Sequence, residues 1–336
     1  MVAMLLDKPW GYLGWLLPLL GITDWSLLGC INPEDRCLAT FNQMEQLDDL
    51  PLTRMLSIKD PPSYYSEAWE RETNRNIDEF RLHGGQLNNI ERHELFERNY
   101  LLVNSVEAFS RESTANVVLD ISTLPKKFFF GIIRLLLKDL HIQNLIVTYT
   151  VPEHYSKEKL AEDPQPCNTL PLFLPIARER ESLNTQIIVG IGFEHFMLPE
   201  LLGRYDLEEL SVKLMLAFPS LPEAYHRSLE FIREIQDVIP ESARKPTIVD
   251  AYNVPDTYDV IDLNSDGNII LAPYGPKTMS LAMCLYAINH DECTEVVYSQ
   301  PTVYNPHYSR GIGSSHYGDI FTFAYCLRYQ GIDLYS

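Results

Sequence analysis

Two short turns, each leading from an apolar strand into an apolar helix, carry the residues best suited to bind an anion. In the first turn, Ser122 and Thr123 supply hydroxyl groups and Lys126 follows a proline; in the second, Tyr274-Gly275 precedes a Pro-Lys pair that ends at Lys277. The start of a helix offers unpaired backbone N–H groups and the positive end of the helix dipole. Proline fits there because its missing N–H would have no partner. The expected chemistry is binding of a phosphate or carboxylate, and plain capping of the two helices is the alternative.

A His-Tyr-Ser motif followed by a basic residue occurs twice, as His154–Lys157 and as His307–Arg310. Tyr155 and Tyr308 have rings that can stack on a nucleobase, and His307 can donate a hydrogen bond or transfer a proton near neutral pH. Tyr304 belongs to the same polar, aromatic loop as His307 and joins the candidate ligand-binding residues. In the alternative interpretation, the tyrosines pack beneath the loops and the histidines face solvent.

Three carboxylates follow apolar strands and are the candidates for acid or base catalysis. Glu34 and Glu194 follow the first strand of each half of the chain, and Asp120 ends the strand before the first Pro-Lys turn. Such groups can bind ribose hydroxyls or exchange protons with a substrate, and they also cap turns. Asp120 has no acidic counterpart at Ala272-Pro273. If only one half performs chemistry, Asp120 therefore marks that half.

The elements that carry these residues recur in the same order. Leu28–Glu34 resembles Val189–Glu194, and Met55–Ile58 resembles Met215–Phe218. The Pro-Lys turns and the His-Tyr-Ser motifs follow in step. A duplicated unit explains four collinear matches, although any two α/β halves share strand–turn–helix composition.

Strands alternate with helices throughout, which indicates a mainly parallel sheet covered on both faces. The expected fold class is α/β, with two tandem Rossmann-like repeats related by a pseudo-two-fold axis. The first repeat spans 1–157 with an apolar N-terminal extension, a proline-rich crossover spans 158–185, and the second repeat spans 186–336. Ligands of open α/β sheets bind at the carboxyl ends of the strands, so the site is expected in a cleft between the two halves.

Some segments give weaker patterns. The sequence predicts helices over 88–99 and 320–327 and a strand over 100–104. Trp10–Leu20 is apolar, but it lacks a cleavage site and is too short to span a bilayer. It is expected to pack as an N-terminal helix or hairpin, and a contact with a partner protein is the alternative.

Composition limits the function. The net charge of −19 disfavours nonspecific binding to nucleic acid or to an anionic membrane. Six cysteines without a CxxC pair indicate a reducing compartment such as the cytoplasm, and neither a metal site nor a cofactor is expected. The sequence lacks GxGxxG, GxxxxGK[ST], GxSxG and HExxH motifs, which disfavours dehydrogenases, P-loop NTPases, α/β-hydrolases and zincins.

The segment Asp120-Ile121-Ser122-Thr123-Leu124-Pro125-Lys126 resembles the ligand-binding turn of CARF-like Rossmann sensor domains. The resemblance covers about ten residues per half, and the second half departs from it with Pro-Tyr-Gly-Pro in place of the hydroxyl residues. It implies a sensor of nucleotide second messengers, a role in prokaryotic antiviral defence, and a covalent duplication in place of the usual dimer.

Three functions are compatible with the sequence. The first is a binding module or sensor for a nucleotide-like or other anionic ligand, which would report to a partner protein within a complex. The second is an enzyme acting on such a ligand, with Asp120 and Glu34 or Glu194 as acid and base. The third is an interaction scaffold whose sites have degenerated.

Overall fold

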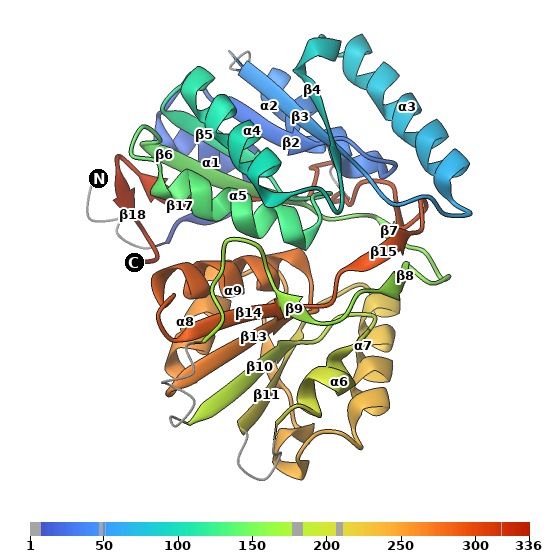
Figure 1. Cartoon of the computed structure of the whole chain (residues 1–336). Helices are drawn as coiled ribbons and strands as arrows, with labels where there is room; N and C mark the ends of the chain where they lie inside the picture. Colours follow the sequence, from blue (N-terminus) through green and yellow to red (C-terminus); the bar gives the residue numbers. More distant parts are fainter. Residues whose placement is uncertain (1–7, 47–49, 51, 177–183, 206–210, 317) are drawn as a thin grey trace. The chain divides into compact units, whose positions relative to one another are not determined.

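The computed structural model describes residues 8–46, 50, 52–176, 184–205, 211–316 and 318–336. The chain divides into two compact units (Figure 1). Unit 1 contains Met1–Glu162 together with Thr302–Ser336, and unit 2 contains Asp163–Pro301. The sequence-based boundaries treat 186–336 as one repeat, whereas the structure assigns the last 35 residues of that range, Thr302–Ser336, to unit 1.

Unit 1 is built on an eight-stranded sheet in the order β1-β17-β6-β5-β2-β3-β4, with β18 paired to β17. Its strands are β1 (Trp10–Tyr12), β2 (Ser26–Cys30), β3 (Leu52–Lys59), β4 (Ile90–Glu94), β5 (Asn116–Asp120), β6 (Asn144–Thr150), β17 (Thr322–Tyr329) and β18 (Ile332–Asp333). Strands β2 to β6 run parallel to one another, and β17 runs antiparallel to β6. The parallel strands are rich in buried apolar residues because helices cover both of their faces.

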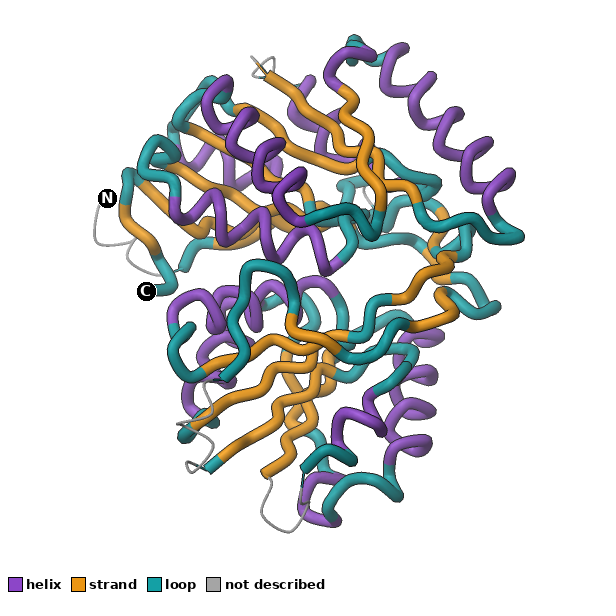
Figure 2. Tube along the Cα trace, viewed as in Figure 1, coloured by secondary structure: helices purple, strands orange, loops and turns teal. Residues whose placement is uncertain are grey.

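Helices cover the sheet of unit 1 on both sides (Figure 2). They are α1 (Leu13–Leu20), α2 (Ala39–Glu45), α3 (Ser66–Leu82), α4 (Asn99–Glu112) and α5 (Lys126–Lys138). Leucines of α1, residues of α2 and Phe80 of α3 form a core with Trp25 on one face. Helices α4 and α5 cover the other face (Figure 1). The segment 128–133 of α5 is apolar and fully buried, so the helix fixes the turn that precedes it.

Unit 2 has a six-stranded sheet in the order β12-β11-β10-β13-β14-β9. Its strands are β9 (Asn168–Thr169), β10 (Thr185–Gly190), β11 (Ser211–Ala217), β12 (Thr247–Val249), β13 (Asn268–Pro273) and β14 (Thr294–Tyr298). Its helices are α6 (Leu198–Leu202), α7 (Pro222–Ile235), α8 (Val254–Leu263) and α9 (Lys277–Asn289). Strands β10 to β14 are parallel, and β9 is antiparallel to β14.

The two sheets share one strand order. In each sheet the parallel strands run third-second-first-fourth-fifth in chain order, and an antiparallel strand follows the fifth. This confirms the predicted α/β class with parallel-dominated Rossmann-like sheets, and it agrees with tandem repeats.

The antiparallel strands are exchanged between the repeats. β17 follows the second repeat in sequence but completes the sheet of unit 1, and β9 follows the first repeat but completes the sheet of unit 2. Two short pairs, β7 (His154–Tyr155) with β16 (Ser309–Arg310) and β8 (Ala161–Pro164) with β15 (Pro301–Tyr304), lie on the segments that lead to the exchanged strands. This exchange is the reason that the sequence boundaries and the units differ.

Three of the weaker predictions were wrong. Residues 320–327 belong mainly to β17, because a short apolar run buried on both faces looks alike in a strand and a helix. The segment predicted as a helix over 88–99 contains β4, an edge strand with few apolar residues, and the strand predicted over 100–104 lies inside α4. The apolar N-terminus does pack, as β1 followed by α1, with four buried leucines in the helix. No helix in the described part of the chain is long and apolar enough to cross a membrane.

Candidate functional site

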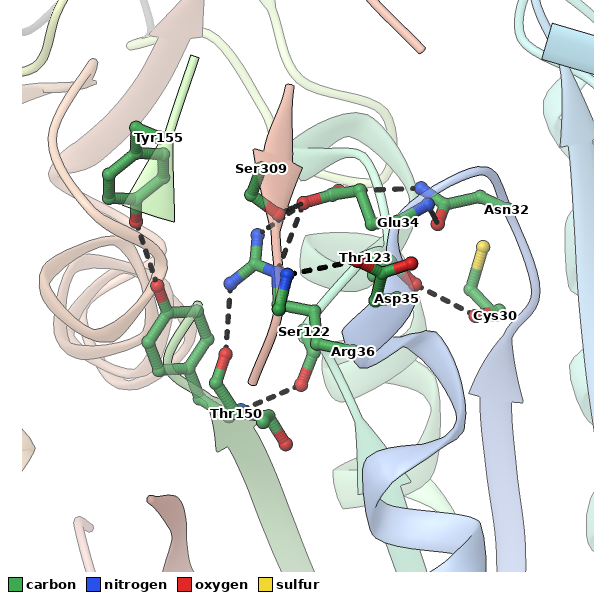
Figure 3. Close-up of polar contacts among 12 residues, drawn as sticks. Cys30, Asn32, Glu34, Asp35, Arg36, Ser122, Thr123, Thr150, Tyr155 and Ser309 are labelled. Carbon is green, nitrogen blue, oxygen red and sulfur yellow. Dashed lines mark hydrogen bonds and ion pairs between the residues drawn. The ribbon is translucent and has the colours of Figure 1, made fainter. Parts of the chain in front are cut away.

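The carboxyl end of β2 carries a buried ion pair between Glu34 and Arg36 (Figure 3). The Nε and Nη2 atoms of Arg36 donate to Oε2 of Glu34 at 3.0 and 2.9 Å, and Nη1 donates to the Thr150 carbonyl at 2.9 Å. Glu34 is 7% exposed and Arg36 is 2% exposed. Burial opposes the charge of Arg36, but the neighbouring Glu34 carboxylate raises the pKa of the guanidinium above its ordinary value. The guanidinium of Arg36 therefore stays charged inside the protein.

Two more side chains donate hydrogen bonds to the Glu34 carboxylate. The Ser309 hydroxyl donates to Oε2 at 2.5 Å, and the Asn32 amide donates to Oε1 at 3.4 Å. Glu34 thus accepts four hydrogen bonds from side chains of its own chain. The geometry gives Glu34 a structural role, and its predicted role as acid or base stays a prediction.

The two His-Tyr-Ser motifs meet each other in unit 1. In the β7–β16 pair, Tyr155 lies opposite Ser309 and His154 opposite Arg310, and the Ser156 N–H donates to the Tyr308 carbonyl at 3.1 Å. The tyrosine of each motif thus lies opposite the serine of the other, which gives the β7–β16 pair a local two-fold symmetry.

The ring of Tyr155 packs edge-on against Tyr308 at 6.1 Å between centroids, and its hydroxyl lies 3.3 Å from that of Tyr149. Burial, followed by the effect of Tyr149, raises the pKa of Tyr155 well above its ordinary value. The phenol therefore stays neutral near physiological pH. Tyr304 and His307 are half-buried in the same C-terminal segment of unit 1, and the His307 N–H donates to the Asn305 side chain. The sequence placed these residues in the second repeat.

The first predicted anion-binding turn is occupied by its own hydrogen bonds. The buried Asp120 carboxylate accepts from the backbone N–H and the hydroxyl of Ser122, and the Ser122 hydroxyl accepts from the Thr150 N–H at 2.7 Å. The Thr123 hydroxyl donates to the Cys30 carbonyl at 2.7 Å (Figure 3). The turn ties the ends of β2, β5 and β6 together. Lys126 begins α5 and is half-buried.

The equivalent turns of unit 2 are built from glycine. A Cβ atom on Gly192, in the turn after β10, would lie 2.0 Å from the Tyr274 carbonyl oxygen. A Cβ atom on Gly275 would lie 2.8 Å from the Met279 sulfur and 3.1 Å from the Ile191 carbonyl oxygen. Only glycine allows the two turns to approach this closely, a use of glycine that is also found in dinucleotide-binding turns. Lys277 then begins α9 and is half-buried.

Tyr274 points away from solvent, into an aromatic core of unit 2. It is 6% exposed, and its ring lies 6.1 Å from Phe231 and 5.5 Å from Tyr298. Its hydroxyl lies 3.4 Å from the Cys167 sulfur. Tyr274 therefore supports the turn through buried contacts, and its predicted part in ligand binding stays a prediction. Glu194 is half-buried in the turn after β10.

Two titratable residues of unit 1 lie near strand ends and were missed by the sequence analysis. Burial raises the pKa of Asp60, just after β3, to about 7, although the Tyr304 backbone N–H acts in the opposite direction. The buried His93 of β4 has Nδ1 2.6 Å from Glu97 and Nε2 3.5 Å from Glu91. Burial alone would lower the pKa of His93, but these two carboxylates outweigh it and raise the pKa above its ordinary value. Neither residue belongs to a repeated motif that could have marked it.

Comparisons with known proteins add little to this geometry. No family model matches the chain, and no curated protein matches it. Among solved structures, the chain is similar to a functionally unknown protein from Pseudomonas aeruginosa PAO1, with a TM-score of 0.24 and 10% identity over 84% of this chain and 95% of that one. A putative universal stress protein from Pseudomonas aeruginosa UCBPP-PA14 gives a TM-score of 0.24 and 11% identity with the same coverage. Likenesses of this size carry no conclusion, so the fold class rests on the strand order.

Proposed function

We propose that this chain is a binding protein for a nucleotide-like or other anionic small molecule, and that the strand-end turns of unit 2 hold the ligand. One contrast carries the proposal. At the strand ends of unit 1, Arg36 donates to Glu34, and Ser122 donates to Asp120 and accepts from the Thr150 N–H. At the same place in unit 2, the turns carry the glycines Gly192 and Gly275 beside the start of α9.

The start of α9 suits a phosphate. The helix is 13 residues long and begins with Lys277 directly after Pro276. Its first turn presents backbone N–H groups and the positive end of the dipole, and Lys277 adds a full charge. The close approach of the two glycine turns brings the backbone after β10 beside this helix start. The start of α5 in unit 1 has the same Pro-Lys pair and is the natural internal comparison.

The enzyme alternative has less support. Catalysis by Asp120 or Glu34 requires a carboxylate that exchanges protons with a substrate, and both accept several hydrogen bonds from neighbouring groups. The CARF-like resemblance of the Asp120–Lys126 segment is the reason to test nucleotides first, and the defence role that it implies stays a prediction. The cytoplasm suits the six free thiols.

Calorimetric titration of the full chain with ADP and with pyrophosphate tests the proposal. Lys277→Ala should weaken binding roughly 10- to 100-fold, the value of a charge-assisted hydrogen bond of about 1.5–3 kcal/mol. The matched variant Lys126→Ala should leave binding unchanged. If neither compound binds, or if the two variants behave alike, the anion site of unit 2 does not exist.

A protein partner is the second candidate, and one observation favours it. Trp15 and Leu19 are four residues apart on α1 and are 72% and 74% exposed. Residues at this spacing share one face of a helix. Large exposed apolar side chains in a contiguous patch commonly mark protein interaction sites.

A further inference from the structure

An aromatic and basic pair, Phe193 and Arg227, lies beside the strand-end turns of unit 2, and neither residue was among the predicted site residues. The guanidinium carbon of Arg227, on α7, lies 5.8 Å from the centroid of the Phe193 ring. Both side chains are half-buried, so each keeps part of its surface accessible. Arg227 and Phe193 therefore form a cation–aromatic pair whose residues are partly exposed, with Nη1 of Arg227 on its buried side.

The pair lies next to the point where the two turns touch. Phe193 directly follows Gly192, whose backbone contacts the Tyr274 carbonyl. Lys277 is three residues beyond Tyr274, so roughly 11 Å of chain at most separates it from that contact. A mononucleotide has dimensions of this order. The pair and the start of α9 can thus contact one ligand.

The loop that carries Phe193 is fixed in place by its own contacts. His195 has Nε2 3.3 Å from Glu234 of α7, and its Nδ1 lies 3.1 Å from the Phe196 carbonyl, which only accepts. Phe196 adopts a φ of 40°, a left-handed conformation that costs energy in a residue other than glycine. Both nitrogens of His195 face acceptors of the chain, so His195 attaches the loop to α7 and the ring of Phe193 stays beside Arg227.

We propose that Phe193 and Arg227 bind the planar heteroaromatic ring of the ligand, so that the ligand of unit 2 is a nucleotide and not a simple phosphate. This inference rests on the anion site at Lys277. Aromatic side chains stack on every nucleobase, and a planar guanidinium stacks on the same rings in a way that an ammonium group does not. The chemical class expected is a nucleoside mono- or diphosphate, or a larger molecule that contains one.

The test uses calorimetry of the full chain with two probes, ADP and pyrophosphate. Phe193→Leu should weaken ADP binding roughly 5- to 100-fold, the effect of one stacked base, and should leave pyrophosphate binding unchanged. Arg227→Lys keeps the charge but loses the planar group, and it should also weaken ADP binding selectively. Phe96→Leu is the matched control, because Phe96 lies 5.0 Å below the Lys127 ammonium in unit 1 and is 43% exposed. It should change neither titration.

The outcomes separate the two proposals. If Lys277→Ala weakens both probes but Phe193→Leu and Arg227→Lys leave ADP binding intact, the base-stacking role is wrong and the anion site stands. Equal losses of ADP and pyrophosphate binding in Phe193→Leu also overturn the stacking role, because the ring would then act through the turn. If Lys277→Ala affects neither probe, the anion site fails and the inference fails with it.

Discussion

Replacing Arg36 with methionine tests whether the strand ends of unit 1 are held by a buried ion pair. Methionine fills much of the same volume but removes three hydrogen bonds, two to Glu34 and one to the Thr150 carbonyl. Glu34 then keeps the hydrogen bonds from the neutral side chains of Ser309 and Asn32. The perturbation therefore leaves a charge without its counter-ion.

The expected cost is large for a single substitution. Breaking a buried ion pair by removing one partner destabilises a protein by about 3–5 kcal/mol, mostly through the charge that is left behind. In a Glu34→Gln background no such charge remains, so the same Arg36→Met change should cost distinctly less. With a urea m-value of about 3 kcal/mol/M, the single variant should lower the unfolding midpoint by roughly 1–1.7 M.

Tryptophan fluorescence measures this effect in unit 1 alone. The four tryptophans of the sequence are Trp10, Trp15, Trp25 and Trp69, all of which belong to unit 1. Trp25 is 1% exposed and lies in the core under α1 and α2. A urea titration followed by fluorescence therefore reports the unfolding of unit 1, while circular dichroism reports both units.

An exposed arginine provides the control. Arg71 is paired with Glu72 at 3.1 Å, but its side chain is 67% exposed, so Arg71→Met should cost less than about 1 kcal/mol. Equal midpoints for Arg36→Met and Arg71→Met would refute the reasoning. The reasoning would also be refuted if Arg36→Met lowered the free energy of unfolding by the same amount with Glu34 and with Glu34→Gln. The loss would then not come from the charge of Glu34.

Three further predictions follow from particular residues. The raised pKa of His93 means that its ion pairs stabilise the fold below about pH 6.5 and lose this effect as pH rises through the folded-state pKa; His93→Gln should therefore cost more stability at pH 6 than at pH 9 in urea titrations, and an equal cost at both would contradict it. Gly192→Ala should destabilise the protein because its Cβ meets a carbonyl oxygen at 2.0 Å, whereas Gly14→Ala, in the exposed first turn of α1 with nothing within 4 Å, should raise thermal stability by about 0.5–1 kcal/mol. Trp15→Ser should cost no more than about 1.5 kcal/mol, because the side chain is 72% exposed and its ring packs edge-on against Tyr12 at 5.4 Å; a cost above about 3 kcal/mol in urea titrations would contradict an exposed position.

The sequence predicted the repeated strand–turn–helix units well, because each is fixed by local pattern. The Pro-Lys pairs do begin helices, at Lys126 and Lys277. The use of the polar residues was harder to foresee. The hydroxyl groups of Ser122 and Thr123 could bind a ligand or bond to neighbouring strand ends, and the sequence pattern is the same in both cases. The positions of Thr150 and Cys30 in the fold decide between these roles.

Side-chain partners that are far apart in the sequence could not be predicted, for the same reason. Arg36 is two residues from Glu34 and gave a local signal that could have been noticed. The Ser309 hydroxyl reaches Glu34 from 275 positions away, and no periodicity contains that information. The edge strand β4 was missed because only Ile90 of its five residues is apolar and only His93 is buried, so pairing with β3 decides its structure.

The exchange of the last strands explains why a repeat that is plain in sequence does not coincide with the compact units. The segment after β14 leaves unit 2 and brings Ser309 to Glu34 in unit 1, whereas the segment after β6 leaves unit 1 and brings Cys167 to Tyr274 in unit 2. Each segment therefore starts at the strand ends of one sheet and finishes against a strand-end turn of the other. Separating the repeats at the sequence boundary would remove β17 from unit 1 and β9 from unit 2. Both sheets would then have an unpaired edge at their fifth parallel strand, and unit 1 would also lose the Ser309 hydrogen bond to its buried carboxylate.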